Sequence, residues 1–157
     1  MRNLSWVFVV ALMIVPMTAK AGFVIEGSVG SGFTVKPDCC HRTPTNIMLA
    51  PGYGLGEMLR AELGIVGNMA DVENSEFDLQ LRPMLVIDPP IIPIYGRLVL
   101  GIFNLLSDAD TEIAYGGALG VSFSLMGLGV FGEVGYIPVG NADTQLLEGR
   151  VGAYYAF

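Results

Sequence analysis

Apolar side chains alternate with polar or small ones along most of this 157-residue chain. In the segment 23–36, Ile25, Val29 and Phe33 occupy odd positions, whereas the even positions carry mostly polar or very small residues. A β-strand points successive side chains to opposite faces, while a helix repeats every 3.6 residues. The alternation therefore predicts an all-β fold. It recurs in segments that we expect to be eight strands: 23–36, 47–55, 59–65, 77–87, 94–102, 112–125, 128–137 and 147–157.

The lengths of these strands and of their connections predict a barrel. Most of the strands approach or exceed the roughly 9–11 tilted residues that cross a bilayer. The connections alternate between longer polar segments and shorter ones, and this asymmetry with an even strand number is typical of membrane barrels. We expect an eight-stranded antiparallel up-and-down transmembrane β-barrel with both termini on the short-turn side. The longer connections are 37–46, 68–76, 105–111 and 138–143, and the shorter ones are 56–58, 88–93 and 126–127.

Side-chain size separates a membrane barrel from a soluble, lipocalin-like barrel, which would turn its apolar face inward. The polar face here is rich in Gly, Ala and Ser, which suits a narrow lumen. Charged residues make up only 15% of the chain, against roughly 25% in an average soluble domain. The opposite face carries large side chains that suit lipid contact. Its aromatic members are Phe23, Phe33, Tyr53, Tyr115, Phe123, Tyr136, Tyr155 and Phe157.

Residues 1–21 have the features of a secretory signal peptide. Arg2 is followed by an almost wholly apolar run over 4–17, and Ala19-Lys20-Ala21 forms a small-residue cleavage motif. The apolar run is too short to span a bilayer comfortably as a helix. We expect export and cleavage, which would leave residues 22–157 as the barrel domain.

The last residues, Arg150-Val-Gly152-Ala-Tyr-Tyr155-Ala-Phe157, resemble the C-terminal assembly signal of small outer-membrane barrels. The chain as a whole resembles, in its pattern, the OmpA/OmpX-like porin-family barrels. This resemblance implies a location in the outer membrane of a Gram-negative bacterium, in contact with its lipid and lipopolysaccharide. It also implies insertion by the outer-membrane assembly machinery, with Arg150, Gly152, Tyr155 and Phe157 as the signal residues.

Charged residues gather on the inward face of the expected barrel. A charge in a narrow lumen has to be paired or hydrated. Because side chains fill the interior of an eight-stranded barrel, we expect a closed lumen, with a small pore for ions or solutes as the alternative. We expect no cofactor or metal. The predicted network consists of Glu26, Arg60, Glu62, Asp78, Arg82, Arg97, Glu133, Glu148 and Arg150.

The loops 37–46 and 68–76 are the expected contact surfaces for an extracellular ligand, because loops carry function on rigid scaffolds. Adjacent Cys39 and Cys40 cannot form a disulfide of ordinary geometry, so a vicinal bridge, free thiols and an intermolecular bridge all stay open. The formal charge of −7 disfavours nucleic-acid binding.

A less favoured alternative is a lipid A-modifying enzyme. It would use His41, the only histidine, as a base for a serine in a neighbouring loop, Ser75 or Ser107. No motif places these residues together, so we expect a non-enzymatic protein with a structural or surface-interaction role.

Overall fold

The computed structural model describes residues 22–36, 41–56, 58–69, 78–89, 92–103, 105, 111–138 and 144–157. This part of the chain is entirely β-structure and contains no helix of the length and apolarity needed to cross a membrane. The predicted signal peptide, 1–21, lies outside the described residues. The strands are β1 (Phe23–Lys36), β2 (His41–Arg42), β3 (Thr45–Gly54), β4 (Leu59–Met69), β5 (Asp78–Ile87), β6 (Ile94–Phe103), β7 (Glu112–Leu125), β8 (Leu128–Pro138) and β9 (Gln145–Ala156).

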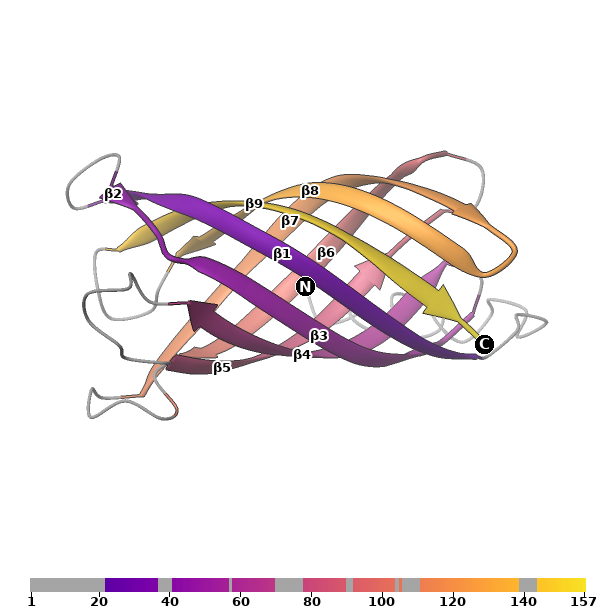
Figure 1. Cartoon of the computed structure of the whole chain (residues 1–157), viewed down its shortest axis with the longest axis horizontal. Coiled ribbons are helices and arrows are strands. Elements are labelled where there is room, and N and C mark those ends of the chain that lie inside the picture. Colours follow the sequence, from indigo (N-terminus) through magenta and orange to yellow (C-terminus); the bar gives the residue numbers. More distant parts are fainter. Residues whose placement is uncertain are drawn as a thin grey trace, which may run out of the picture.

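The eight long strands close into an antiparallel barrel (Figure 1). Each pairs with its neighbour in the sequence, and β1 pairs with β9 from Val24↔Ala156 to Lys36↔Gln145. Strand β2 pairs with β1, through Phe33↔Arg42 and Thr34↔His41, beyond the point where β3 begins. The predicted eight-stranded up-and-down architecture is therefore confirmed.

Several strands extend further than the sequence predicted. The expected loop 37–46 contains β2 and the first residues of β3, and the expected loop 68–76 begins with two residues of β4. Asn46 pairs with Asn68 and Thr45 with Met69. These loop boundaries were wrong because ladder hydrogen bonds join main-chain groups and continue where the hydrophobic alternation has stopped.

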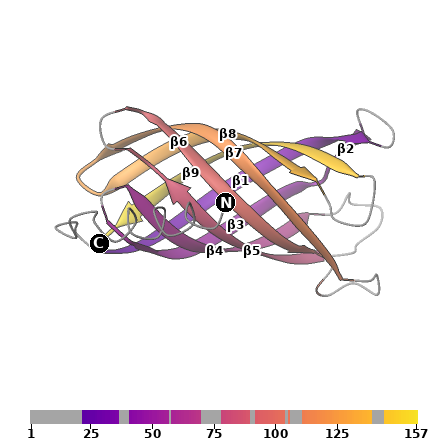
Figure 2. The same cartoon turned by 180° about the vertical axis from the view of Figure 1, so that it is seen from behind.

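The two ends of the barrel differ. The termini of the barrel meet at one end, where the Phe157 amide donates to the Phe23 carbonyl oxygen at 2.9 Å. The described residues of the short connections, 55–56, 58, 88–89, 92–93 and 126–127, lie at this same end, which we call the turn end. The opposite end, where β1, β4, β6 and β8 finish, is the loop end; Figure 2 shows both ends from behind, with β5, β6 and β7 crossing obliquely.

The outer face of the barrel is apolar. Every long strand exposes large apolar side chains, such as Leu119, which is 70% exposed at the middle of β7. Among the described strand side chains, the exposed ones that carry a charge are Lys36 and Arg42, both at the loop end. The predicted orientation, with the polar face inward, is what the burial pattern shows.

Glycines on the inner face make room for inward aromatic rings. A Cβ atom added at Gly120 would lie 2.6 Å from Cε1 of Tyr95, and one at Gly129 would overlap the Tyr154 ring. The Tyr95 and Phe131 rings meet edge to face, with centroids 6.1 Å apart. The high glycine content thus serves the packing of a narrow, side-chain-filled interior.

Candidate functional site

The lumen contains a continuous series of buried charged side chains, which come from six of the eight long strands. Eight of the nine residues predicted for the network place their side chains in the interior. The ninth, Asp78, begins β5, and its side chain lies outside the described residues. Asp88, which lies in the expected short connection 88–93 and is not among the predicted residues, joins the network. The signal for Asp88 was its position, because it continues the inward series of Arg82, Met84 and Val86 one step past the end of β5.

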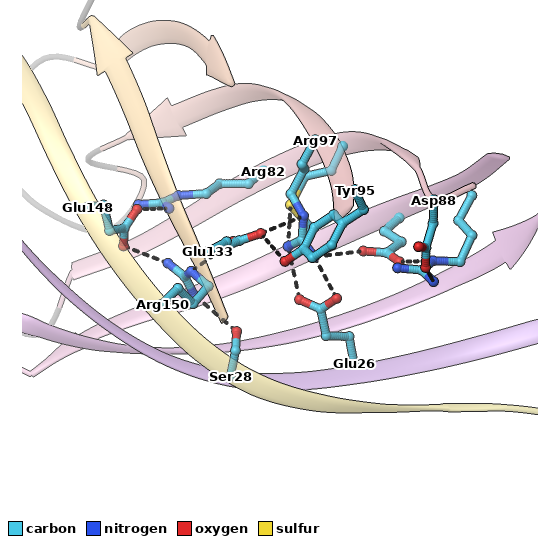
Figure 3. Close-up of polar contacts among 12 residues, drawn as sticks. Glu26, Ser28, Arg82, Asp88, Tyr95, Arg97, Glu133, Glu148 and Arg150 are labelled. Carbon is cyan, nitrogen blue, oxygen red and sulfur yellow. Dashed lines mark hydrogen bonds and ion pairs between the residues drawn. The ribbon is translucent and has the colours of Figure 1, made fainter. Parts of the chain in front are cut away.

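The central layer is built around Arg97 on β6 (Figure 3). Its Nη1 and Nη2 donate to the two carboxylate oxygens of Glu26 on β1, at 2.9 and 2.7 Å. Its Nε lies 3.3 Å from Oε2 of Glu133, which also accepts a 2.6 Å hydrogen bond from the Tyr95 hydroxyl. The side chains of Arg97 and Glu26 are 1% and 0% exposed. This fork-to-fork geometry is the strongest form of the arginine–carboxylate interaction.

A second layer lies toward the loop end. Arg82 on β5 and Arg150 on β9 both donate to Glu148, through Nη1 at 2.7 Å and Nη2 at 2.6 Å. Amide groups complete it, since Arg150 also donates to Asn46 and Arg82 donates twice to Gln80. Two guanidinium groups around one carboxylate leave this layer with a net positive charge.

A third layer lies toward the turn end. Arg60 on β4 donates to Glu62 through Nε at 3.0 Å and to Asp88 through Nη1 at 2.9 Å. Its guanidinium carbon lies 4.6 Å from the centroid of the Tyr154 ring, and Ser122 donates to the second oxygen of Asp88. Two carboxylates around one guanidinium give this layer a net negative charge.

Longer ion pairs connect the three layers. Arg97 Nη2 lies 3.9 Å from Glu62 Oε2, and Arg150 Nε lies 3.7 Å from Glu133 Oε1. Glu62 Oε2 and Arg97 Nε are the buried side-chain atoms of the described residues that lack a hydrogen bond within the protein, although each faces an opposite charge. The network therefore crosses the whole middle of the barrel, joining strands that are far apart in the sequence.

Open space inside the barrel is concentrated at its two ends. A vestibule of about 480 Å³ at the turn end reaches Arg60 and Asp88, and one of about 220 Å³ at the loop end reaches Gln80 and Arg82. Between them, the central layers enclose a cavity of about 20 Å³ beside Arg97. That volume is enough for about one water molecule.

The residues of the predicted assembly signal divide between the two faces. Arg150 is part of the lumen network, and a Cβ atom added at Gly152 would lie 2.6 Å from the Phe131 ring. Tyr155 and Phe157 point outward at the turn end, with ring centroids 4.8 Å apart and perpendicular planes. Their role in assembly stays a prediction.

The loop residues of the enzymatic alternative are only partly described. His41 is exposed on β2 at the loop end. Ser75 and Ser107 lie outside the described residues, as do Cys39 and Cys40.

No family model and no curated protein matches this chain in sequence. Two solved structures do match it in fold. Neisserial surface protein A (NspA) superposes with a TM-score of 0.63 over 86% of this chain and 97% of its own, at 13% sequence identity. The N-terminal β-barrel domain of Pseudomonas aeruginosa OprF superposes with a TM-score of 0.59 over 87% of this chain and 99% of its own, at 12% identity.

The fold is that of the small outer-membrane β-barrels. Sequence identities of 12–13% establish the likeness of fold alone. What the chain does has to be argued from its own residues.

Proposed function

We propose that the chain is an integral outer-membrane β-barrel of a Gram-negative bacterium, exported through the signal peptide 1–21, with a closed lumen and a structural or surface-interaction role. The outer face supports this, because it is apolar on every long strand. The exposed charged side chains that the structure describes on the strands lie at the loop end. A closed barrel also satisfies its main-chain hydrogen bonds internally, as a spanning structure must in lipid.

The central Arg97 layer is the observation that carries the closed-lumen proposal. Arg97 bridges β6 to β1 through Glu26 and approaches β8 through Glu133, so one side chain crosses the lumen. The rings of Tyr95 and Phe131 pack beside it. The space left there, about 20 Å³, does not join the two vestibules into a continuous channel of solute size.

Surface interaction would take place at the loop end, in contact with lipopolysaccharide. The loops 37–46 and 68–76 are our proposed contact surfaces for an extracellular ligand. Two exposed charged side chains are described at this end: Arg42 in the first loop and Lys36 at the end of β1. Assembly through the C-terminal residues Arg150, Gly152, Tyr155 and Phe157 is part of the same proposal. It includes no catalytic step, cofactor or nucleic-acid partner.

A small pore is the second candidate, and the two vestibules favour it. They enter the barrel from opposite ends, and among the described residues it is side chains that lie between them. A rearrangement of the Arg97 layer together with the Arg82–Glu148–Arg150 layer would join them. The closed barrel and the small pore differ in whether the network of charged side chains blocks the lumen in the native protein.

Conductance across a planar lipid bilayer tests the proposal. We expect purified, refolded wild-type protein to give no steady openings, because the Arg97–Glu26 layer blocks the lumen. The variant Arg97→Ala, Glu26→Ala, Arg82→Ala, Glu148→Ala removes two ion pairs from the layers that separate the vestibules and leaves Arg150 beside Glu133, and it should conduct. Steady wild-type openings whose size changes on Arg82→Ala would support the pore and contradict the closed lumen.

A further inference from the structure

The hairpin between β7 and β8 has an unusual turn. Leu125 pairs with Leu128, and the two residues between them, Met126 and Gly127, have φ of 54° and 87°. Two positive φ values are what a type I′ turn needs, and Asn-Gly is the usual solution. Met126 is the one non-glycine residue at positive φ in the described part of the chain. A methionine there carries a steric penalty that Asn or Gly would lessen.

The same turn exposes its apolar side chains. Met126 is 93% exposed, and Leu125 and Leu128 on either side are 76% and 57% exposed. Nothing within the hairpin compensates for the strain, since the Met126 side chain has almost no contact with the rest of the chain. Because Asn or Gly would form this turn with less strain, the retention of Met126 points to a contact with something outside the protein chain.

The other turns share this character. Leu55 and Met58 are exposed in the first turn, Ile92 in the second, and Phe157 at the end of β9. The carboxylate of Asp88 is turned inward to Arg60. Glu57, in the first turn, lies outside the described residues. These side chains, with Leu125, Met126 and Leu128, form what we call the apolar rim of the turn end.

The apolar rim continues the outer face without a break. Phe123 on β7 and Val130 on β8 are exposed directly next to the Leu125–Leu128 turn and belong to the apolar outer face. At the loop end, in contrast, Lys36 and Arg42 are exposed. The outer face therefore ends in charged side chains at the loop end and in apolar ones at the turn end.

We propose that the apolar rim is immersed in the inner leaflet of the membrane, with Met126 among lipid chains rather than in water. The inference rests on the proposed membrane location and specifies how deeply the turn end of the barrel lies in the membrane. Lipid is the partner we choose because the rim is continuous with the lipid-facing surface and none of its described side chains carries a charge. Because Met126 and Phe157 also line the turn-end vestibule, its mouth then lies at the same depth as the apolar rim.

Fluorescence at position 126 tests this directly. In a variant carrying Cys39→Ser and Cys40→Ser, we would introduce Met126→Cys, label it with a polarity-sensitive dye, and refold the protein into phosphatidylcholine vesicles. We expect blue-shifted emission, quenching by lipid with a nitroxide on its acyl chain, and protection from iodide. The matched controls are Val130→Cys on the outer face and Arg42→Cys at the loop end.

The controls separate the two proposals. Iodide quenching at 126 together with lipid quenching at 130 would overturn the immersed rim and leave the membrane barrel standing. Iodide quenching at both 126 and 130 would overturn the membrane barrel itself. Protection at 126 from both quenchers would show that a protein, such as a second copy of the chain, covers the rim, and this result also overturns the lipid proposal.

A pair of variants gives an independent readout. Met126→Asn and Met126→Asp are nearly isosteric and tolerate positive φ equally, so they differ mainly in charge. If the rim is in the lipid interface, the Asp variant should unfold from vesicles with an equilibrium constant about fivefold larger than that of the Asn variant. Equal constants, as we expect for Arg42→Asn and Arg42→Asp, would contradict the proposal.

Discussion

Replacing Arg97 by Met should lower the free energy of unfolding by about 3–5 kcal/mol, the usual cost of removing one partner from a buried ion pair. Glu26 is fully buried and would lose both of its hydrogen bonds from Arg97. Glu133 would lose its nearest guanidinium nitrogen, 3.3 Å away. Urea unfolding from lipid vesicles, followed by far-ultraviolet circular dichroism, measures the loss.

The control for this experiment is the double variant Arg97→Met, Glu26→Gln. It removes the fully buried Glu26 charge together with its partner, and buried pairs replaced together by neutral groups are often nearly neutral in stability. We therefore expect it to recover much of the loss. If the single and double variants are equally unstable, the buried Arg97–Glu26 pair is not the reason for the effect.

The second large effect concerns the outer face. Leu119→Arg should destabilise the folded protein in vesicles by about 2–4 kcal/mol, the cost of an arginine on the lipid side of a barrel near the bilayer centre. Leu119 lies at the middle of β7, and its neighbour Ala118 pairs with Arg97 of the central layer. Leu119→Ala serves as the control, because it removes apolar surface without adding charge. An Arg variant no less stable than the Ala variant would mean that this face meets water.

The division of side chains between the two faces could be predicted from the sequence, because it depends only on the period of a strand. Glu26, Arg97 and Glu133 all follow from it, and so does the exposure of Leu119. The period is also what makes Asp88 recognisable in retrospect. Asp88 was not predicted because it stands directly before Pro89 and Pro90, where the alternation of β5 stops at Ile87.

The pairing of the charges could not be predicted. Glu26 and Arg97 are 71 residues apart in the sequence, and whether they meet depends on the stagger of every strand between β1 and β6. Tyr95 and Phe103 were missed as inward residues for another reason. Strand β6 is apolar on both faces, so the difference in polarity between its alternate residues is too small to show which of them point inward.

The most direct test of the closed membrane barrel is the electrophoretic mobility of the protein in SDS with and without boiling. An outer-membrane fraction from the expressing bacterium would be loaded cold and boiled on the same gel. We expect the protein in this fraction, and we expect the cold sample to migrate differently, because a closed barrel with a paired lumen resists SDS until it is heated. A single position under both conditions, with the protein in the soluble periplasmic fraction, would contradict a closed membrane barrel and favour a soluble barrel with its ligand inside.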